Sequence, residues 1–348
     1  MSKIGNILKE ARIKKKLTGV EAAKLIGMDA SLLNRIESGA RMPTKQHIQS
    51  MAKLYKIPVK TLQIEWLSEK IYKELEGEDY ALEALQVAEA ILSYGKVDYE
   101  DEEIIAKINK LKKQLDAIRP ISKAQLQNLR NYFKVQYTFD SNRIEGNTLT
   151  LQETALVVDK GITISGKSVQ EHLEAINHSE AVDLIIDLAQ NKTTLSEYVL
   201  KQLHGLVLRG IDKNNAGKYR SVNVMISGSS HKPPQPFMLA KLMEDYFLFY
   251  ELNRSTMHPV LLAAEMHERL VTIHPFIDGN GRTSRLIMNL ILMQHGFPIT
   301  NISGERQNRL AYYNSLEAVQ VQNDKSKFYE FVCKAVHFSL TEYLGLVK

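Results

Sequence analysis

The sequence predicts an all-α protein, mainly helical, in which one small β-hairpin interrupts the series of helices. Apolar residues recur at helical spacing along most of the 348 residues. Two stretches, 260–273 and 286–293, are apolar on nearly every side, which is typical of helices buried in a domain core. Residues 218–226 instead alternate apolar and polar side chains, as a strand does. A chain of this length is sufficient for two or three domains.

The charge of the chain is unevenly distributed. Residues 1–60 contain 13 Lys and Arg against 4 Asp and Glu, a net charge of +9, whereas the whole chain carries +5. A basic head on a mildly acidic body indicates that the head binds a polyanion. The single cysteine, Cys333, excludes an internal disulfide. Because no apolar run is long enough for a membrane span or a signal peptide, we expect a cytoplasmic protein without a membrane partner.

The basic head, residues 1–62, is predicted to form short helices joined by tight turns. An amphipathic helix over 4–16 is followed by a capping box that starts a second helix at Thr18. Asp29 can cap a third helix, and a fourth starts at Thr44. Short helices separated by glycine turns are typical of a helix-turn-helix domain.

The run Leu33-Asn34-Arg35-Ile36-Glu37-Ser38-Gly39-Ala40-Arg41-Met42-Pro43 resembles the Xre/phage-repressor family. In that family the third helix enters the major groove, so the resemblance implies contacts to double-stranded DNA from Ser31, Asn34, Arg35 and Arg41. Gly19 and Ala30 depart from the family, which often has Gln at these two positions. Contacts to the DNA backbone would still give salt-sensitive affinity. The alternative is a helix-turn-helix that serves only dimerisation or protein contacts.

A charged helical linker is predicted over residues 63–118, without chemistry of its own. Trp66 is predicted to pack the head against this linker. Arg119-Pro120 marks the start of the body, residues 119–348, in which a helix from about Lys123 to Phe139 comes first.

The chemistry is concentrated in twelve residues between the two apolar stretches, His274-Pro275-Phe276-Ile277-Asp278-Gly279-Asn280-Gly281-Arg282-Thr283-Ser284-Arg285. The glycines and the asparagine tolerate backbone angles that turn successive N–H groups inward, forming an anion-binding nest where the next helix begins. Arg282 and Arg285 are three residues apart, so they share a face of that helix, and guanidinium groups bind phosphate in a bidentate manner.

Two further residues of the loop suggest a reaction rather than binding alone. Asp278 is its only carboxylate, and one carboxylate together with phosphate oxygens commonly holds Mg²⁺. His274 has an ordinary pKa near neutrality, as a general base requires. The loop therefore predicts a polyphosphate site with a metal ion and a base.

This loop resembles the signature of the Fic family, H-x-F-x-[D/E]-G-N-G-R-x-x-R, and matches it at every specified position. The resemblance covers about the last two-thirds of the chain and implies a Fic domain with a catalytic core over residues 193–335. Enzymes of this family mostly transfer AMP from ATP to a hydroxyl of a target protein. The resemblance implies that His274 deprotonates the hydroxyl and that Asp278 holds Mg²⁺. It also implies that ATP is bound by Gly279, Asn280, Gly281, Arg282 and Arg285, the last at the γ-phosphate.

The stretch Ser141-Asn142-Arg143-Ile144-Glu145-Gly146-Asn147 resembles the inhibitory motif of the Fic family, [S/T]-x-x-x-E-[G/N]. The resemblance implies an inhibitory helix over 130–147, in which Glu145 pairs with Arg285 and blocks productive docking of ATP. Ser141, Gly146 and Asn147 complete the motif. The alternative is an ordinary helix with a surface glutamate that stops at Gly146.

The alternating segment 218–226 leads into a turn at Ser227 and Gly228 and then into prolines, which predicts a hairpin with an exposed edge. It resembles the Fic flap, which receives a segment of the target as an added strand, here through Val224, Ile226, Ser227 and Gly228. A plain surface hairpin is the alternative.

A predicted helix over 309–318 presents Tyr312 and Tyr313. The family resemblance places this segment at the nucleobase of ATP. Aromatic residues of a helical core fit the same pattern, so both interpretations stay open.

These observations favour a protein adenylyltransferase that uses ATP and Mg²⁺, modifies a Ser, Thr or Tyr hydroxyl of a target protein, is inhibited by Glu145 and carries a DNA-binding head. Within the family, transfer of another nucleotide or phosphate-containing group, or removal of AMP with Glu145 positioning water, stays open. A different alternative is a DNA-binding transcriptional regulator whose body senses nucleotide. His274 favours the enzyme, because binding phosphate requires no general base. A homodimer is compatible with each interpretation.

Overall fold

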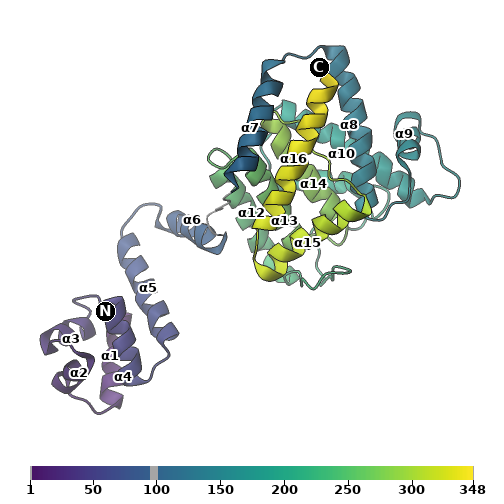
Figure 1. The fold of residues 1–348 in the computed structure, drawn as a ribbon. Coiled ribbons are helices and arrows are strands. Elements are labelled where there is room, and N and C mark those ends of the chain that lie inside the picture. Colours follow the sequence, from purple (N-terminus) through teal and green to yellow (C-terminus); the bar gives the residue numbers. More distant parts are fainter. Residues whose placement is uncertain (1, 95–100, 348) are drawn as a thin grey trace. The chain divides into compact units, whose positions relative to one another are not determined.

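The structure is a computed structural model that describes residues 2–94 and 101–347. The chain divides into two compact units, Met1–Leu92 and Ser93–Lys348 (Figure 1). In the described ranges every regular element is helical, which confirms the predicted mainly helical class, and none is a strand. None of the helices in these ranges has the length and hydrophobicity needed to cross a membrane. Part of the predicted linker, residues 95–100, lies outside the described residues.

The first unit contains the short helices expected of the head. The helices are α1 (Lys3–Lys14), α2 (Gly19–Ile26), α3 (Ala30–Glu37), α4 (Lys45–Tyr55) and α5 (Val59–Leu75), followed by α6 (Ala81–Tyr94). The predicted caps are present, because Thr18 and Glu21 form a capping box on α2 and Asp29 accepts a hydrogen bond from the Ser31 backbone N–H at α3. Local sequence therefore sets where these helices begin.

A buried ion pair and one close backbone approach hold α1 against α3. Arg12 donates to both carboxylate oxygens of Glu37, with Nε–Oε1 and Nη2–Oε2 distances of 2.7 Å. Gly5 lies so close to the end of α3 that a Cβ atom there would be 2.8 Å from the Glu37 carbonyl oxygen. Trp66 of α5 donates through Nε1 to the Pro43 carbonyl at 2.8 Å, which joins α5 to the core of the head.

The second unit is a larger helical domain. Its helices are α7 (Glu102–Ala117), α8 (Lys123–Ile144), α9 (Leu151–Lys160), α10 (Val169–Gln190), α11 (Glu197–Val207), the 3₁₀ turn η1 (Pro236–Met238), α12 (Leu239–Asn253), α13 (Pro259–Ile273), α14 (Asn280–Gln294), α15 (Arg306–Gln322) and α16 (Ser326–Val347). Although α7 falls in the predicted linker, it packs along α16 and buries Ile108 and Leu115 in the core of this domain.

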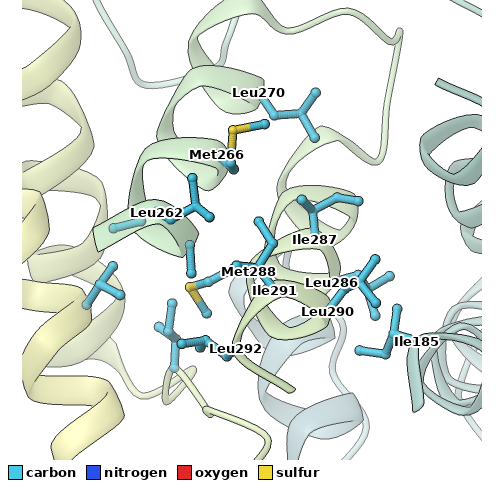
Figure 2. Close-up of a cluster of buried hydrophobic side chains, with 14 of the residues drawn as sticks. Ile185, Leu262, Met266, Leu270, Leu286, Ile287, Met288, Leu290, Ile291 and Leu292 are labelled. Atoms are coloured by element: carbon cyan, nitrogen blue, oxygen red, sulfur yellow. The ribbon is translucent and has the colours of Figure 1, made fainter. Parts of the chain in front are cut away.

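The two apolar stretches of the sequence form α13 and α14, the most intimately packed pair of helices in the domain. Figure 2 shows Leu262, Met266 and Leu270 of α13 beside Ile287 and other apolar side chains of α14. Nearly all of α14 is buried because α8, α10 and α11 also pack against it. A helix surrounded in this way needs apolar side chains on all its faces, which explains the pattern. The core therefore presents the α13–α14 loop on a rigid base.

The predicted β-hairpin does not form, and this part of the fold prediction is wrong. The segment from Lys218 to Gln235 is an irregular loop, without a ladder of hydrogen bonds among the described residues, and turns where the Ser229 N–H donates to the Ile226 carbonyl at 3.2 Å. The alternating side chains do not lead to strand pairing. The buried side chain of Arg220 instead binds the carbonyls of Val222 and Pro234, which would be acceptors in a β-ladder.

Candidate active site

His274 is the C-cap of α13 and lies in the left-handed region, with φ 51°. Its ring Nδ1 is 3.1 Å from the Val271 carbonyl oxygen. A carbonyl can only accept, so Nδ1 carries the ring hydrogen and Nε2 keeps a lone pair. Burial lowers the pKa of His274 below its ordinary value, which favours the neutral ring. The side chain is therefore prepared to accept a proton through Nε2.

The side chain of Asn280 stabilises the loop by hydrogen bonds to the backbone four residues earlier. Asn280 accepts from the Phe276 N–H at 3.0 Å and donates to the Phe276 carbonyl at 2.9 Å. Its side chain is buried and occupied, so its contribution to a bound phosphate would come from its backbone. Gly279 precedes it with φ 75° and without a side-chain cap. The first N–H groups of α14 thus stay available at the positive end of the helix.

His204 of α11 supports the loop between α13 and α14 by contacts with Phe276 and Asp278. No pattern in the sequence indicates this role. Its ring stacks on Phe276 with centroids 3.6 Å apart. The Gly217 N–H donates to Nδ1 at 2.9 Å, so Nε2 donates to the Asp278 carbonyl, also at 2.9 Å. Burial lowers the pKa of His204 to about 4, so the ring is neutral at physiological pH. His204 is consequently a fixed support and not a second base.

Arg282 is a buried cation that is incompletely paired. Its side chain is 3% exposed, and Nη2 lies 3.1 Å from Oδ2 of Asp278. Nη1 is 3.5 Å from a carboxylate oxygen of Glu174 on α10, but within the described ranges neither Nη1 nor Nε has a hydrogen-bond partner. Buried donors without partners are rare in proteins, and they fit an anion that the residues of this site would hold.

Arg285 is the other arginine of the loop, and its side chain is 1% exposed. Nη2 donates to Oε1 of Glu145 at 2.7 Å and to the Ser141 carbonyl at 2.9 Å, while Nε donates to the Ser141 hydroxyl at 3.0 Å. Burial opposes the charged form, but Glu145, together with Tyr312 and Tyr137, outweighs burial, and the pKa of Arg285 is raised. The pair predicted from the sequence is thus present as a contact.

The Glu145 carboxylate also covers the first turn of α14. A Cβ atom at Gly281 would collide with its Oε1. A carboxylate therefore lies where the glycine leaves room for an anion, at the N-terminus of a helix.

Gly146 and Asn147 fix the turn that carries Glu145, and Asp140 fixes the helix that leads into it. Asn147 donates to Oε2 of Glu174 at 2.8 Å and accepts from the Leu149 N–H at 3.0 Å, and Gly146 takes a φ of 102°. Just upstream, Asp140 accepts from the Gly304 N–H at 2.7 Å, which ties α8 to the loop before α15. Glu174 and Asp140 were not predicted, because side-chain partners this far apart in sequence leave no periodic signal.

Asp278 is the residue predicted to hold a metal ion. Its side chain is 60% exposed, and its Oδ1 accepts from the Gly279 N–H at 2.7 Å. In the described part of the chain no group of three His, Cys, Asp or Glu side chains is arranged to hold a metal. A single carboxylate fits a Mg²⁺ ion that takes its remaining ligands from phosphate oxygens and water.

The two tyrosines of α15 have different surroundings. Tyr312 is 1% exposed, and its hydroxyl lies 3.4 Å from Nη1 of Arg285 and 3.1 Å from Nε2 of His267. It therefore braces Arg285 from the core and presents no face to a nucleobase in this structure. Tyr313 is 39% exposed and donates to the Ile144 carbonyl at 2.9 Å. Contact with a nucleobase stays a prediction for Tyr313.

The other predicted site residues lie outside this cluster. In the loop that replaces the hairpin, Val224 and Ile226 are half-buried, while Ser227 and Gly228 are exposed. In the head the predicted DNA contacts are all exposed on α3 or just after it, at Ser31, Asn34, Arg35 and Arg41. Their functions stay predictions.

Known proteins resemble the chain in both parts. Residues 194–292 match the Fic/DOC family and residues 8–62 match the helix-turn-helix family. Proteins named protein adenylyltransferase Fic are 35% identical in Nematostella vectensis, over 254 residues, and in Drosophila grimshawi, over 246. These matches cover 72% and 70% of this chain but 58% and 50% of the relatives, so the chain spans about half the length of the curated relatives it matches.

Among solved structures, a Fic domain containing signaling protein from Bacteroides thetaiotaomicron superposes with a TM-score of 0.65 at 28% identity. The superposition covers 69% of this chain and 96% of that protein. The loop signature, the helical fold around it and these relatives agree. This chain therefore carries a domain of the Fic/DOC family, together with a helix-turn-helix domain in its basic head.

Proposed function

We propose that this protein is an adenylyltransferase that moves AMP from ATP to a Ser, Thr or Tyr hydroxyl of a target protein, and that Glu145 inhibits it. The names of the relatives support the reaction class. The observation that carries the proposal most is in the α13–α14 connection, where a neutral histidine with a free Nε2 at the end of α13 precedes two buried arginines in the first turns of α14, one of them without full pairing.

In the reaction, Nε2 of His274 takes the proton of the target hydroxyl. The hydroxyl oxygen forms a bond to the α-phosphorus, and the bond from this phosphorus to the oxygen bridging to the β-phosphate breaks. Pyrophosphate leaves with that electron pair. Arg282 and the N–H groups of α14 stabilise the charge that develops on the phosphate oxygens. Mg²⁺, held by Asp278, would neutralise phosphate charge and help orient the leaving group.

Inhibition follows from the position of one carboxylate. Glu145 binds Arg285 and covers the first turn of α14, so it excludes a phosphate from the same place by charge and by volume. A triphosphate can bind there productively only after Glu145 leaves. Because the pair is desolvated on the side of Arg285, breaking it without a replacement anion is costly.

Incubation of the full chain with α-³²P-ATP and Mg²⁺ tests the proposed function. We expect protein-bound label with Glu145→Gly and none with the Glu145→Gly/His274→Ala double variant. Identical labelling of wild type and both variants, or none in all three with ATP bound, would refute the proposed reaction.

The pH dependence of the reaction is expected to follow His274. A base must be neutral, and burial lowers the pKa of this group below its ordinary value, so the rate should be constant through pH 7–8 and fall only below about pH 6.5. Since the Glu145 charge raises this pKa, the acid limb of Glu145→Gly should lie lower still. The measurement is kcat/KM between pH 5 and 8.5; a limb above pH 7 would contradict the assignment.

A second function, DNA binding, is favoured by the head. Its net charge of +9 lies in a helix-turn-helix unit whose third helix exposes Asn34 and Arg35. Counterion release from a duplex would supply salt-dependent affinity.

Replacing Arg35 and Arg41 by alanine should weaken binding to a fluorescent 20-base-pair duplex. Each arginine that neutralises a phosphate contributes about 0.9 to the slope of log K against log salt, so the double variant should lose up to about 1.8. Fluorescence anisotropy between 50 and 200 mM NaCl measures this slope. Lys9→Ala/Lys53→Ala is the charge-matched control on α1 and α4; an equal loss in the control would mean that α3 has no special place in binding.

A further inference from the structure

Arg220 is a buried cation whose side-chain hydrogen-bond partners, among the residues that the structure describes, are all main-chain oxygens. Its side chain is 3% exposed. Nε donates to the His274 carbonyl at 2.8 Å, Nη1 to the Val222 carbonyl at 3.0 Å and Nη2 to the Pro234 carbonyl at 2.6 Å. Its own backbone N–H donates to the Pro275 carbonyl at 2.9 Å. One residue thus joins two segments that lie about fifty residues apart in sequence.

The first segment is the irregular loop that replaces the predicted hairpin, here called the flap and comprising residues 221–235. Val222 and Pro234 lie near its two ends, and both are held by the same guanidinium group. As no ladder joins the two sides of the flap, this group does the work that cross-strand hydrogen bonds do in a hairpin. A planar guanidinium with donors in fixed directions is suited to hold three carbonyls at once.

The second segment is the start of the Fic signature loop. His274 takes a left-handed backbone conformation, which is unfavourable for a residue with a Cβ atom and persists only where its surroundings enforce it. Bonds from Arg220 to the carbonyl of His274 and to that of Pro275 hold the backbone there from one side. On the other side the His274 N–H remains bound to the Leu270 carbonyl.

No carboxylate of the described residues forms an ion pair with Arg220, so salt bridging within them does not explain its burial. Hydrogen bonds to charged groups are stronger than neutral ones, and the three bonds of the guanidinium group offset the cost of burying this charge. Arg209 and Arg254, by contrast, form exposed ion pairs on the surface of the same unit. Arg220 therefore contributes by fixing the positions of the carbonyl groups that it binds, and not by balancing a negative charge.

We propose that Arg220 is a positioning residue that sets the flap, and hence the target hydroxyl, in register with Nε2 of His274. This inference rests on the proposed function, since it concerns the acceptor side of the same transfer. Arg220 is buried on carbonyls, so in this proposal it acts through the backbone of the two segments and not on ATP or the target directly. It fixes the two segments between which the acceptor must lie. This positioning matters because misplacement of reacting atoms by about 1 Å can reduce the rate about 100-fold.

The test uses Arg220→Lys and Arg220→Gln in the full chain carrying Glu145→Gly. Lysine keeps the charge but cannot reach three carbonyls in different directions, and glutamine keeps a planar group without the charge. Both variants should transfer AMP to protein about 100-fold more slowly than the Glu145→Gly parent. The dissociation constant for ATP should change less than about twofold, because the hydrogen bonds of the Arg220 side chain in the described structure go to His274, Val222 and Pro234 and none goes to α14.

Two readouts separate positioning from a general loss of structure. Hydrolysis of ATP to free AMP requires the proposed phosphate-binding groups of α14 but not the flap. The ratio of protein-bound to free AMP should therefore fall in both variants. Hydrogen exchange should accelerate over residues 221–235 and stay unchanged in α13 and α14. Hydrogen exchange needs no enzyme activity, so it tests whether Arg220 holds the flap even if the variants transfer no AMP.

Arg269→Lys is the matched control. Arg269 is another buried arginine of this unit, stacked on Phe249 and paired with Glu265, and its replacement should leave exchange in the flap unchanged. Full transfer by Arg220→Lys, weakened ATP binding in parallel with transfer, or faster exchange throughout α13 and α14 would each overturn the inference. If the Glu145→Gly parent itself labels no protein, the proposed function fails, whereas the exchange result still decides whether Arg220 holds the flap.

Discussion

Glu145→Gly is expected to raise the rate of AMP transfer to protein on the order of 100-fold. In the wild type a productive triphosphate must displace Glu145 from Arg285. A hydrogen bond between charged groups is worth about 1.5–3 kcal/mol, and each 1.4 kcal/mol is a factor of ten. Removing the carboxylate abolishes this cost, and it opens the space above Gly281 that Glu145 Oε1 now covers. Labelling with α-³²P-ATP over time measures the rate.

Glu145→Gln separates charge from volume in this prediction. Glutamine fills the same space and can still accept a hydrogen bond from Arg285, but it lacks the charge, so its activity should lie between wild type and Glu145→Gly. The buried Arg285 loses its anion in both variants, so their melting temperatures should fall without ligand and recover more than that of wild type with ATP and Mg²⁺. A Glu145→Gly protein no more active than wild type, with unchanged ATP affinity, would contradict inhibition by Glu145.

His274→Ala in the Glu145→Gly background is expected to reduce transfer by about 10²–10⁴-fold, the usual cost of losing a general base. Binding of ATP should persist, because the arginines and the α14 N–H groups remain. The measurement is single-turnover transfer at saturating ATP, which removes any contribution from nucleotide affinity.

The backbone at this position requires a second variant. His274 has a positive φ, which alanine tolerates poorly and asparagine tolerates well. His274→Asn therefore removes the base while the loop keeps its path, and it should lose as much activity as His274→Ala. If the asparagine variant retained most of the transfer, the ring would be a structural cap and another group would be the base.

Local sequence was sufficient for most of the secondary structure. The capping boxes and glycine turns of the head reappear as α1–α4, and the two apolar stretches reappear as α13 and α14. These features depend on neighbouring residues, so the sequence displays them directly. The loop from His274 to Arg285 could be assigned for the same reason, because all its chemical groups are contiguous.

The hairpin shows where local pattern was insufficient. Alternation over 218–226 satisfied the rule for a strand, but strands form only when a partner satisfies their backbone groups. Here Arg220 binds the carbonyls at both ends of the flap, and the segment stays irregular. Similarly, α7 reads as part of a charged linker, and only its contact with α16 places it in the core.

By itself, then, the sequence determined the helical class, the helix-turn-helix head and the Fic signature loop, in which phosphate binding stays a prediction, because each depends on residues that are close along the chain. Tertiary structure alone decided the supports of that loop. His204, Glu174 and Arg220 come from separate segments. His204 and Arg220 reach main-chain partners in the loop by long-range hydrogen bonds, and Glu174 accepts one from Asn147 beside the loop. Such bonds impose no spacing on the sequence. Only the packing of α10 and α11 against α14, and the bonds of Arg220 to His274 and Pro275, bring these groups together.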